Sequence, residues 1–81
     1  MEKKAILEEV NEIFKEIFDD ETLVITEETT AKDIEDWDSF EHINLIVAIE
    51  QRFHIKFNMK EVSDMKNVGE MIGIIEQRIQ N

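Results

Sequence analysis

Residues 38–55 read DSFEHINLIVAIEQRFHI, and this stretch decides how the chain folds. Its apolar residues recur every three or four positions, which is the period of one helix face, so it predicts a helix over about residues 39–53. Asp38 is the expected N-cap, and Glu41 three residues later gives a pattern that resembles a capping box. The expected buried stripe consists of Ile43, Ile46, Val47, Ile49 and Phe53, widened by Leu45 and Ala48.

The segments on either side of this helix predict three more. Apolar residues at the same spacing indicate a helix over about residues 3–18, which Asp19-Asp20 would end because acids are unfavourable at a helix C-terminus. Asn58 is the expected cap of a short helix over about 59–65, and Asn67 with Glu70 begins a last helix over about 68–80.

The connection over residues 19–37 is long for a compact domain. Its scattered apolar residues suggest that it lies over the helices, with a short turn at about 31–35 capped by Thr29 or Thr30. The expected fold class is therefore all-α: a four-helix bundle, with three long helices and one short one, and a long first loop.

Composition narrows the class further. With 81 residues, the chain is expected to be a single domain over residues 1–81. It contains no cysteine, which excludes disulfides, thiolate metal sites and a cysteine nucleophile. No apolar stretch is long enough for a signal-peptide core or a membrane span, so we expect a cytoplasmic protein.

The charge is strongly negative and unevenly distributed. A net charge of −11 argues against nucleic acid as a partner, because nucleic-acid binding depends on Lys and Arg. Residues 19–41 hold ten acids and one base, Lys32, and so carry −9 of that charge. This acidic window is either a solvated loop or a docking surface for basic patches on partner enzymes.

Ser39 is the residue that carries the chemistry. It follows the expected cap directly, at a helix N-terminus where backbone N–H groups and the helix dipole favour an attached phosphate. Serine is also common there simply because it helps to satisfy free N–H groups. Taken alone, the triplet Asp38-Ser39-Phe40 does not decide between these two interpretations.

Together with the helix that follows, the triplet resembles the acyl carrier protein family. The family pattern is Asp-Ser-Leu, then an apolar helix that ends in Leu-Glu-x-x-Phe, with a β-branched residue two positions later. Here residues 49–55 read IEQRFHI, and the resemblance covers nearly the whole chain. It implies a monomeric carrier without catalytic activity. A phosphopantetheinyl transferase, with coenzyme A and Mg²⁺, would attach 4′-phosphopantetheine to Ser39, and the arm would present acyl thioesters to partner enzymes.

The chain departs from the family pattern at two places. Phe40 replaces the usual Leu, and either fills a partner's pocket or folds back onto the bundle. The main helix is less acidic than in fatty-acid carriers, with Asn44, Gln51 and Arg52 where acids are common. We therefore expect a specialised pathway, such as secondary metabolites or cell-surface lipids. The alternatives are an aminoacyl or peptidyl carrier, and an unmodified acidic adaptor that only binds a protein partner.

Other chemistry finds little support in the residues. His42 and His54 lie twelve positions apart without metal-ligand spacing, and both are expected to be surface histidines. Glu27-Glu28 lie in the loop without a paired base, so general acid–base catalysis is not expected. No catalytic residue and no metal ligand is predicted.

Overall fold

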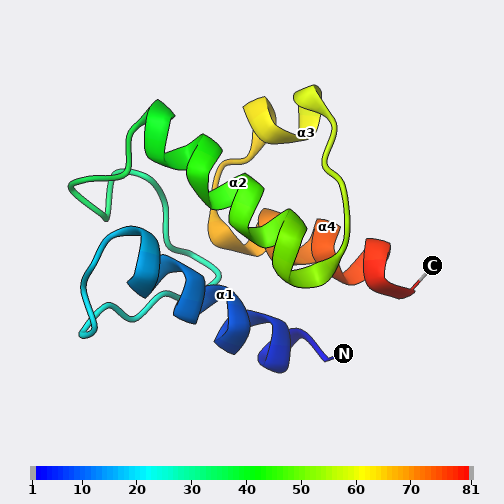
Figure 1. Ribbon diagram of the computed structural model, residues 1–81, viewed down its shortest axis with the longest axis horizontal. Helices are drawn as coiled ribbons and strands as arrows, with labels where there is room; N and C mark the ends of the chain where they lie inside the picture. Colours follow the sequence, from blue (N-terminus) through cyan, green and yellow to red (C-terminus); the bar gives the residue numbers. More distant parts are fainter. Residues whose placement is uncertain (1, 81) are drawn as a thin grey trace.

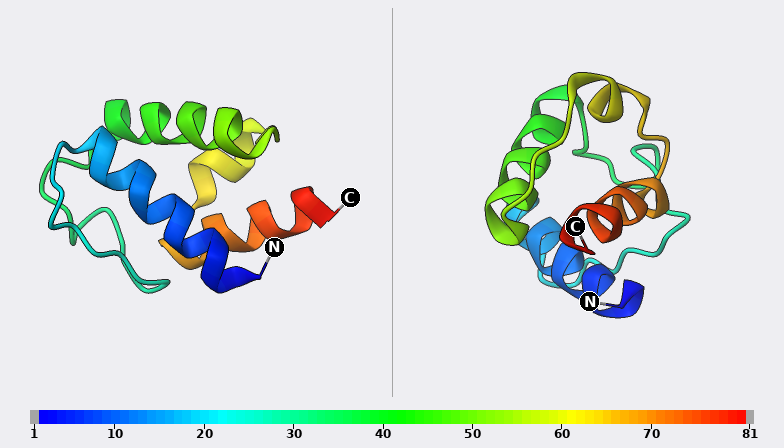
Figure 2. Two further views of the ribbon diagram at one scale, coloured as in Figure 1. Left: turned by 60° about the horizontal axis from the view of Figure 1, so that its bottom comes forward. Right: turned by 90° about the vertical axis from the view of Figure 1, so that its right-hand side faces the viewer.

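The computed structural model describes residues 2–80, and this part of the chain contains four helices and no strand. They are α1 (Lys3–Ile17), α2 (Ser39–Phe53), α3 (Met59–Asp64) and α4 (Val68–Gln80). Figure 1 shows α3 on the far side of the bundle from α1, and the second view in Figure 2 agrees. The all-α fold with one short helix is therefore confirmed.

The core lies where α1 packs against α2 and α4. All three long helices contribute fully buried side chains to it, whereas α3 contributes none. Three residues of the long connection, loop 1 (residues 18–38), are buried with them, which confirms that this loop packs over the helices. The buried apolar residues are Ile6, Val10, Ile13, Phe14, Ile25, Ile34, Trp37, Leu45, Ile46, Ile49, Val68, Met71, Ile72 and Ile75.

The predicted buried stripe of α2 is wrong in part. Ile43 and Val47 are 53% and 46% exposed, whereas Leu45 is completely buried beside Ile46 and Ile49. Successive residues turn by about 100° around a helix, so Ile43 and Leu45 point in nearly opposite directions. Because α2 is apolar on both of these sides, its own period did not show which side would face α1.

Loop 1 is held in place by polar contacts to both α1 and α4. The Asn11 side chain on α1 donates to the Leu23 carbonyl (3.2 Å) and accepts from the Ile25 N–H (2.7 Å). At the start of α4, the Val68 and Gly69 N–H groups donate to loop carbonyls, those of Thr29 and Glu27, at 2.9 and 2.8 Å. These bonds satisfy N–H groups that a helix N-terminus leaves free.

The turn inside loop 1 is capped by Thr30, one of the two predicted threonines. Its hydroxyl accepts from the Lys32 N–H (3.2 Å), and its own N–H donates to the Asp33 carboxylate (2.8 Å). Thr29 instead accepts from the Thr26 N–H (2.9 Å). The turn brings Ile34 and Trp37 back onto the core just before α2 begins.

The other predicted caps are present. Asn58 and Glu61 form a complete capping box at α3, with bonds of 2.8 and 3.0 Å. Asn67 accepts from the Glu70 N–H at the start of α4 (2.9 Å). No helix in residues 2–80 has the length and apolar character that a membrane crossing requires.

Candidate functional site

Ser39 is the first residue of α2, and it is exposed at the surface. Asp38 is the N-cap, as predicted: its carboxylate accepts from the Glu41 N–H (2.8 Å), and its carbonyl accepts from the His42 N–H (2.9 Å). The hydroxyl of Ser39 therefore lies at the end of a well-formed helix, where another molecule has access to it.

The predicted capping box at α2 is only half formed. The Glu41 carboxylate does not return to the Asp38 backbone, because it accepts from the Asn44 side-chain amide instead (2.8 Å). The Asp38 N–H donates to the Asp36 carbonyl (3.1 Å). Glu41 thus points along the helix rather than back over the N-terminus beside Ser39.

Two backbone donors remain available beside the Ser39 hydroxyl. Within residues 2–80, the N–H groups of Ser39 and Phe40 have no hydrogen-bond acceptor. Free N–H groups at a helix start, together with the positive end of the helix dipole, suit a phosphate. The donor set therefore fits a phosphodiester on the Ser39 oxygen.

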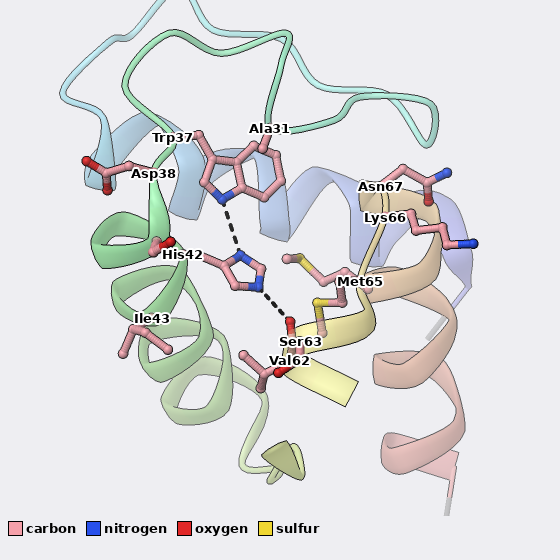
Figure 3. A pocket seen from close by; sticks show the side chains of 12 residues that line it. Ala31, Trp37, Asp38, His42, Ile43, Val62, Ser63, Met65, Lys66 and Asn67 are labelled. Carbon is pink, nitrogen blue, oxygen red and sulfur yellow. Dashed lines mark hydrogen bonds between the residues drawn. The ribbon is translucent and has the colours of Figure 1, made fainter. Parts of the chain in front are cut away.

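His42 is not the surface histidine that the sequence predicted. Its ring is partly buried beside Trp37, with the ring centres 5.9 Å apart. The Trp37 Nε1–H donates to His42 Nδ1 (3.2 Å), and His42 Nε2 lies 3.0 Å from the Val62 carbonyl on α3 (Figure 3). Trp37 in turn packs edge-on against Phe14, with the ring centres 5.2 Å apart. His54, in contrast, is exposed as predicted.

A cavity of about 580 Å³ lies beside Ser39, between α2, α3 and the start of α4. Figure 3 shows the His42 side chain projecting into it from α2, between Trp37 and Val62. Its volume is within the range of small-molecule sites. The lining residues are Ala31, Trp37, Asp38, Ser39, His42, Ile43, Val62, Ser63, Met65, Lys66, Asn67 and Met71.

The surface around Ser39 carries both exposed apolar residues and acids. Phe40 is 74% exposed, so it does not fold back onto the bundle, and Ile43 and Val47 continue the exposed apolar surface along α2. A groove that Phe40 also lines brings together acids from loop 1 and from α2. Its acidic lining residues are Asp19, Glu35, Asp36, Asp38 and Glu41.

Asp20, in the acidic window of residues 19–41, has a structural role in the turn after α1. Asp20 accepts from the Thr22 hydroxyl (2.6 Å) and from the Thr22 N–H (3.0 Å), and these bonds lower the pKa of its carboxyl. Asp20 thus contributes to the turn after α1. Nowhere in residues 2–80 do three His, Asp or Glu side chains gather as a metal site would need.

No protein-family model matches the chain. A curated relative from Exiguobacterium sibiricum, named acyl carrier protein, is 30% identical over 79 residues, which are 98% of this chain and 100% of that protein. The chain belongs to the acyl carrier protein family. Proteins of this family are carriers rather than enzymes, and this chain is accordingly a carrier.

A solved structure shows the same fold. The solution NMR structure of the holo acyl carrier protein from Geobacter metallireducens is 40% identical and superposes with a TM-score of 0.86. The match covers 91% of this chain and 85% of that one. The Geobacter protein was solved in its holo form, that is, with its prosthetic group.

Sequence reasoning missed two residues that shape this carrier. Asn11 ties loop 1 to α1, yet it lies among the apolar positions of its helix, and a lone polar residue there is a signal of a specific partner. Gly69 lets loop 1 approach α4: an added Cβ would lie 3.0 Å from the Glu27 carbonyl oxygen. A glycine in the first turn of a helix is the sequence signal that another part of the backbone approaches closely there.

Proposed function

We propose that Ser39 is the attachment site of 4′-phosphopantetheine, and that residues 1–81 form one carrier domain that presents acyl groups to partner enzymes. The observation that carries the proposal is the placement of an exposed serine at the first position of α2, in a chain of the acyl carrier protein family. The arm would supply a thiol that holds the acyl group as a thioester, which a chain without cysteine lacks.

The residues around Ser39 have separate tasks in this proposal. Asp38 holds the first turn of α2 and so fixes the position of the hydroxyl that a phosphopantetheinyl transferase must reach. The free N–H groups of Ser39 and Phe40 would donate to the added phosphate. Asp38 itself would place a negative charge close to that phosphate, and the two N–H groups would offset the repulsion.

The acidic groove that contains Asp36 and Glu41 is the proposed docking surface for basic patches on partner enzymes. Phe40 and Ile43 add apolar contact area next to Ser39. Phe40 in place of the usual Leu and the reduced acidity of α2 favour a carrier in lipid, fatty-acid or polyketide-type biosynthesis of a specialised kind. We expect it to work as a monomer in the cytoplasm. An aminoacyl or peptidyl cargo is the alternative that the same site would serve.

Intact mass spectrometry tests the proposal. The protein is incubated with coenzyme A, Mg²⁺ and a broad-specificity phosphopantetheinyl transferase. We expect the mass to rise by one phosphopantetheine. Ser39→Ala should gain nothing, while Ser63→Ala should gain the full mass, since Ser63 is the other serine of the chain and also lines the cavity. No gain in the folded wild-type protein would favour the unmodified adaptor instead.

A further inference from the structure

The cavity beside Ser39 is crossed by a continuous chain of hydrogen bonds. It runs from the Trp37 indole through both nitrogens of the His42 ring to the Val62 carbonyl, at 3.2 and 3.0 Å (Figure 3). It thereby joins loop 1, α2 and α3 across the space between them. Any group that enters this space deeply must push the imidazole aside.

The direction of each bond follows from the chemistry of the indole. An indole N–H can only donate, so His42 Nδ1 must accept with its lone pair. The neutral ring then has its proton on Nε2 and donates it to the Val62 carbonyl. Trp37 is 9% exposed, so an apolar group that fills the cavity and displaces His42 would leave the indole N–H without a partner.

The Val62 carbonyl depends on His42 because α3 is short. In a longer helix this carbonyl would accept from the N–H four residues later, that of Lys66. That N–H instead donates to the Glu70 carboxylate (3.1 Å), and α3 ends at Asp64. The imidazole therefore serves as the C-terminal partner of α3.

We propose that His42 is a specificity-determining residue that keeps straight alkyl groups out of the cavity. An alkyl chain offers no hydrogen bond, so its entry would strip the indole N–H, the imidazole and the Val62 carbonyl of their partners. The carrier accordingly holds its acyl group outside the bundle. This inference rests on the proposed arm at Ser39.

The chemical reactivity of the loaded thioester tests the inference. The transferase loads the protein directly from acetyl- or octanoyl-coenzyme A, and intact mass confirms loading before anything else is measured. Hydroxylamine then attacks the thioester carbonyl carbon: a C–N bond forms, the C–S bond breaks, and the arm leaves as its thiol. Each rate is divided by that of the same thioester on free coenzyme A.

We expect the normalised rates of the acetyl and octanoyl forms to agree in the wild-type protein. In His42→Leu the octanoyl form should react roughly tenfold more slowly than the acetyl form. This ratio corresponds to about nine-tenths of the octanoyl groups lying inside the cavity, out of reach of hydroxylamine. His54→Asn is the matched control, because it removes the exposed histidine and should behave as the wild type does. Circular dichroism checks that each variant stays helical.

A second variant covers the case in which His42→Leu does not fold. Trp37→Phe retains an aromatic ring against Phe14 but has no N–H, so its octanoyl form should be protected to an intermediate degree. Protection of the octanoyl form already in the wild type would overturn the inference, and so would equal rates for both acyl groups in the folded variants. A protein that gains no mass at all contradicts the proposed function instead.

Discussion

Alanine substitutions at the two glycines should change stability in opposite directions. A Cβ at Gly69 would lie 3.0 Å from the Glu27 carbonyl oxygen and 3.3 Å from the Glu27 Cβ, so loop 1 would have to move. The same movement stretches the bond from the Gly69 N–H to that carbonyl (2.8 Å) and the neighbouring bond from Val68 to Thr29 (2.9 Å). At Gly73, nothing lies within 4 Å of an added Cβ.

These contacts set the magnitudes. Overpacking costs typically about 1–3 kcal/mol, which exceeds the roughly 1 kcal/mol that alanine gains over glycine in a helix, so Gly69→Ala should destabilise the fold by about 1 kcal/mol. Gly73→Ala lies in the middle of α4 without steric conflict and should stabilise the fold by about 0.5–1 kcal/mol. The free energies of unfolding of the two variants should thus differ by about 2 kcal/mol, or roughly 8–16 °C in Tm for a domain of this size.

Urea unfolding measures the difference, followed by far-UV circular dichroism and by the fluorescence of Trp37. Trp37 is the single tryptophan of the chain and is buried against Phe14, so it reports on the core next to loop 1. Equal stability of the two variants, or a Gly69→Ala variant more stable than Gly73→Ala, would refute the assigned close approach of loop 1 to α4.

Three further predictions concern charged side chains. Asp38→Ala should cost about 1 kcal/mol of stability, whereas Asp38→Asn should retain the cap. If the transferase loads both variants as fast as the wild type, the Asp38 carboxylate has no role beyond capping. Charge reversal at Asp36 and Glu41 should slow association with a partner enzyme more at low than at high salt, and equal slowing at both salt concentrations in stopped-flow measurements would contradict electrostatic docking. The hydrogen bond from Arg78 (2.5 Å) and, to a smaller extent, that from the Asn58 N–H lower the pKa of Glu61. The ionised Glu61 therefore contributes to the stability of the fold at neutral pH, and this contribution disappears as the pH falls below the ordinary carboxyl range. The stability difference between wild type and Arg78→Met should accordingly be smaller at about pH 3 than at neutral pH, as urea titrations at both pH values would show.

Helix positions were predictable from the sequence because their signals are local. Asp38, Asn58 and Asn67 each accept a hydrogen bond from the N–H three residues later, so each helix start depends on residues that are close together in the chain. The exposed position of Ser39 follows from the same local signal. Its attachment role came from the resemblance of the whole pattern to a family.

The two errors at α2 are related. His42 was expected at the surface because it lacks metal-ligand spacing, and the stripe predicted through Ile43 and Val47 gave no reason to bury it. The observed stripe through Leu45 and Ile49 has His42 in the same row, three and seven positions earlier. Which row faces inward is decided by α1, a contact between segments far apart in the sequence. The position of the polar His42 in line with a buried row indicated that it would be partly buried. The sequence did not indicate that Trp37 and Val62 would be its hydrogen-bond partners.

The wall of the cavity opposite Ser39 is attached differently from the rest of the bundle. The long helices are held by buried apolar side chains, whereas α3 has none that is fully buried, although Val62 packs partly against the core. Polar contacts add to this packing: His42 to the Val62 carbonyl, Arg78 to Glu61, and Arg78 to the Lys56 carbonyl (2.8 Å) just before α3.

Polar attachment has a consequence for a carrier. A hydrogen bond contributes about 0.5–1.5 kcal/mol net, so these three contacts add a few kcal/mol to the partial apolar packing of Val62 and Met65. We therefore expect α3 to open more readily than the long helices, which have fully buried side chains. Because a hydrogen bond also requires defined geometry, these contacts fix where α3 lies, and with it the surface that a partner enzyme meets around Ser39.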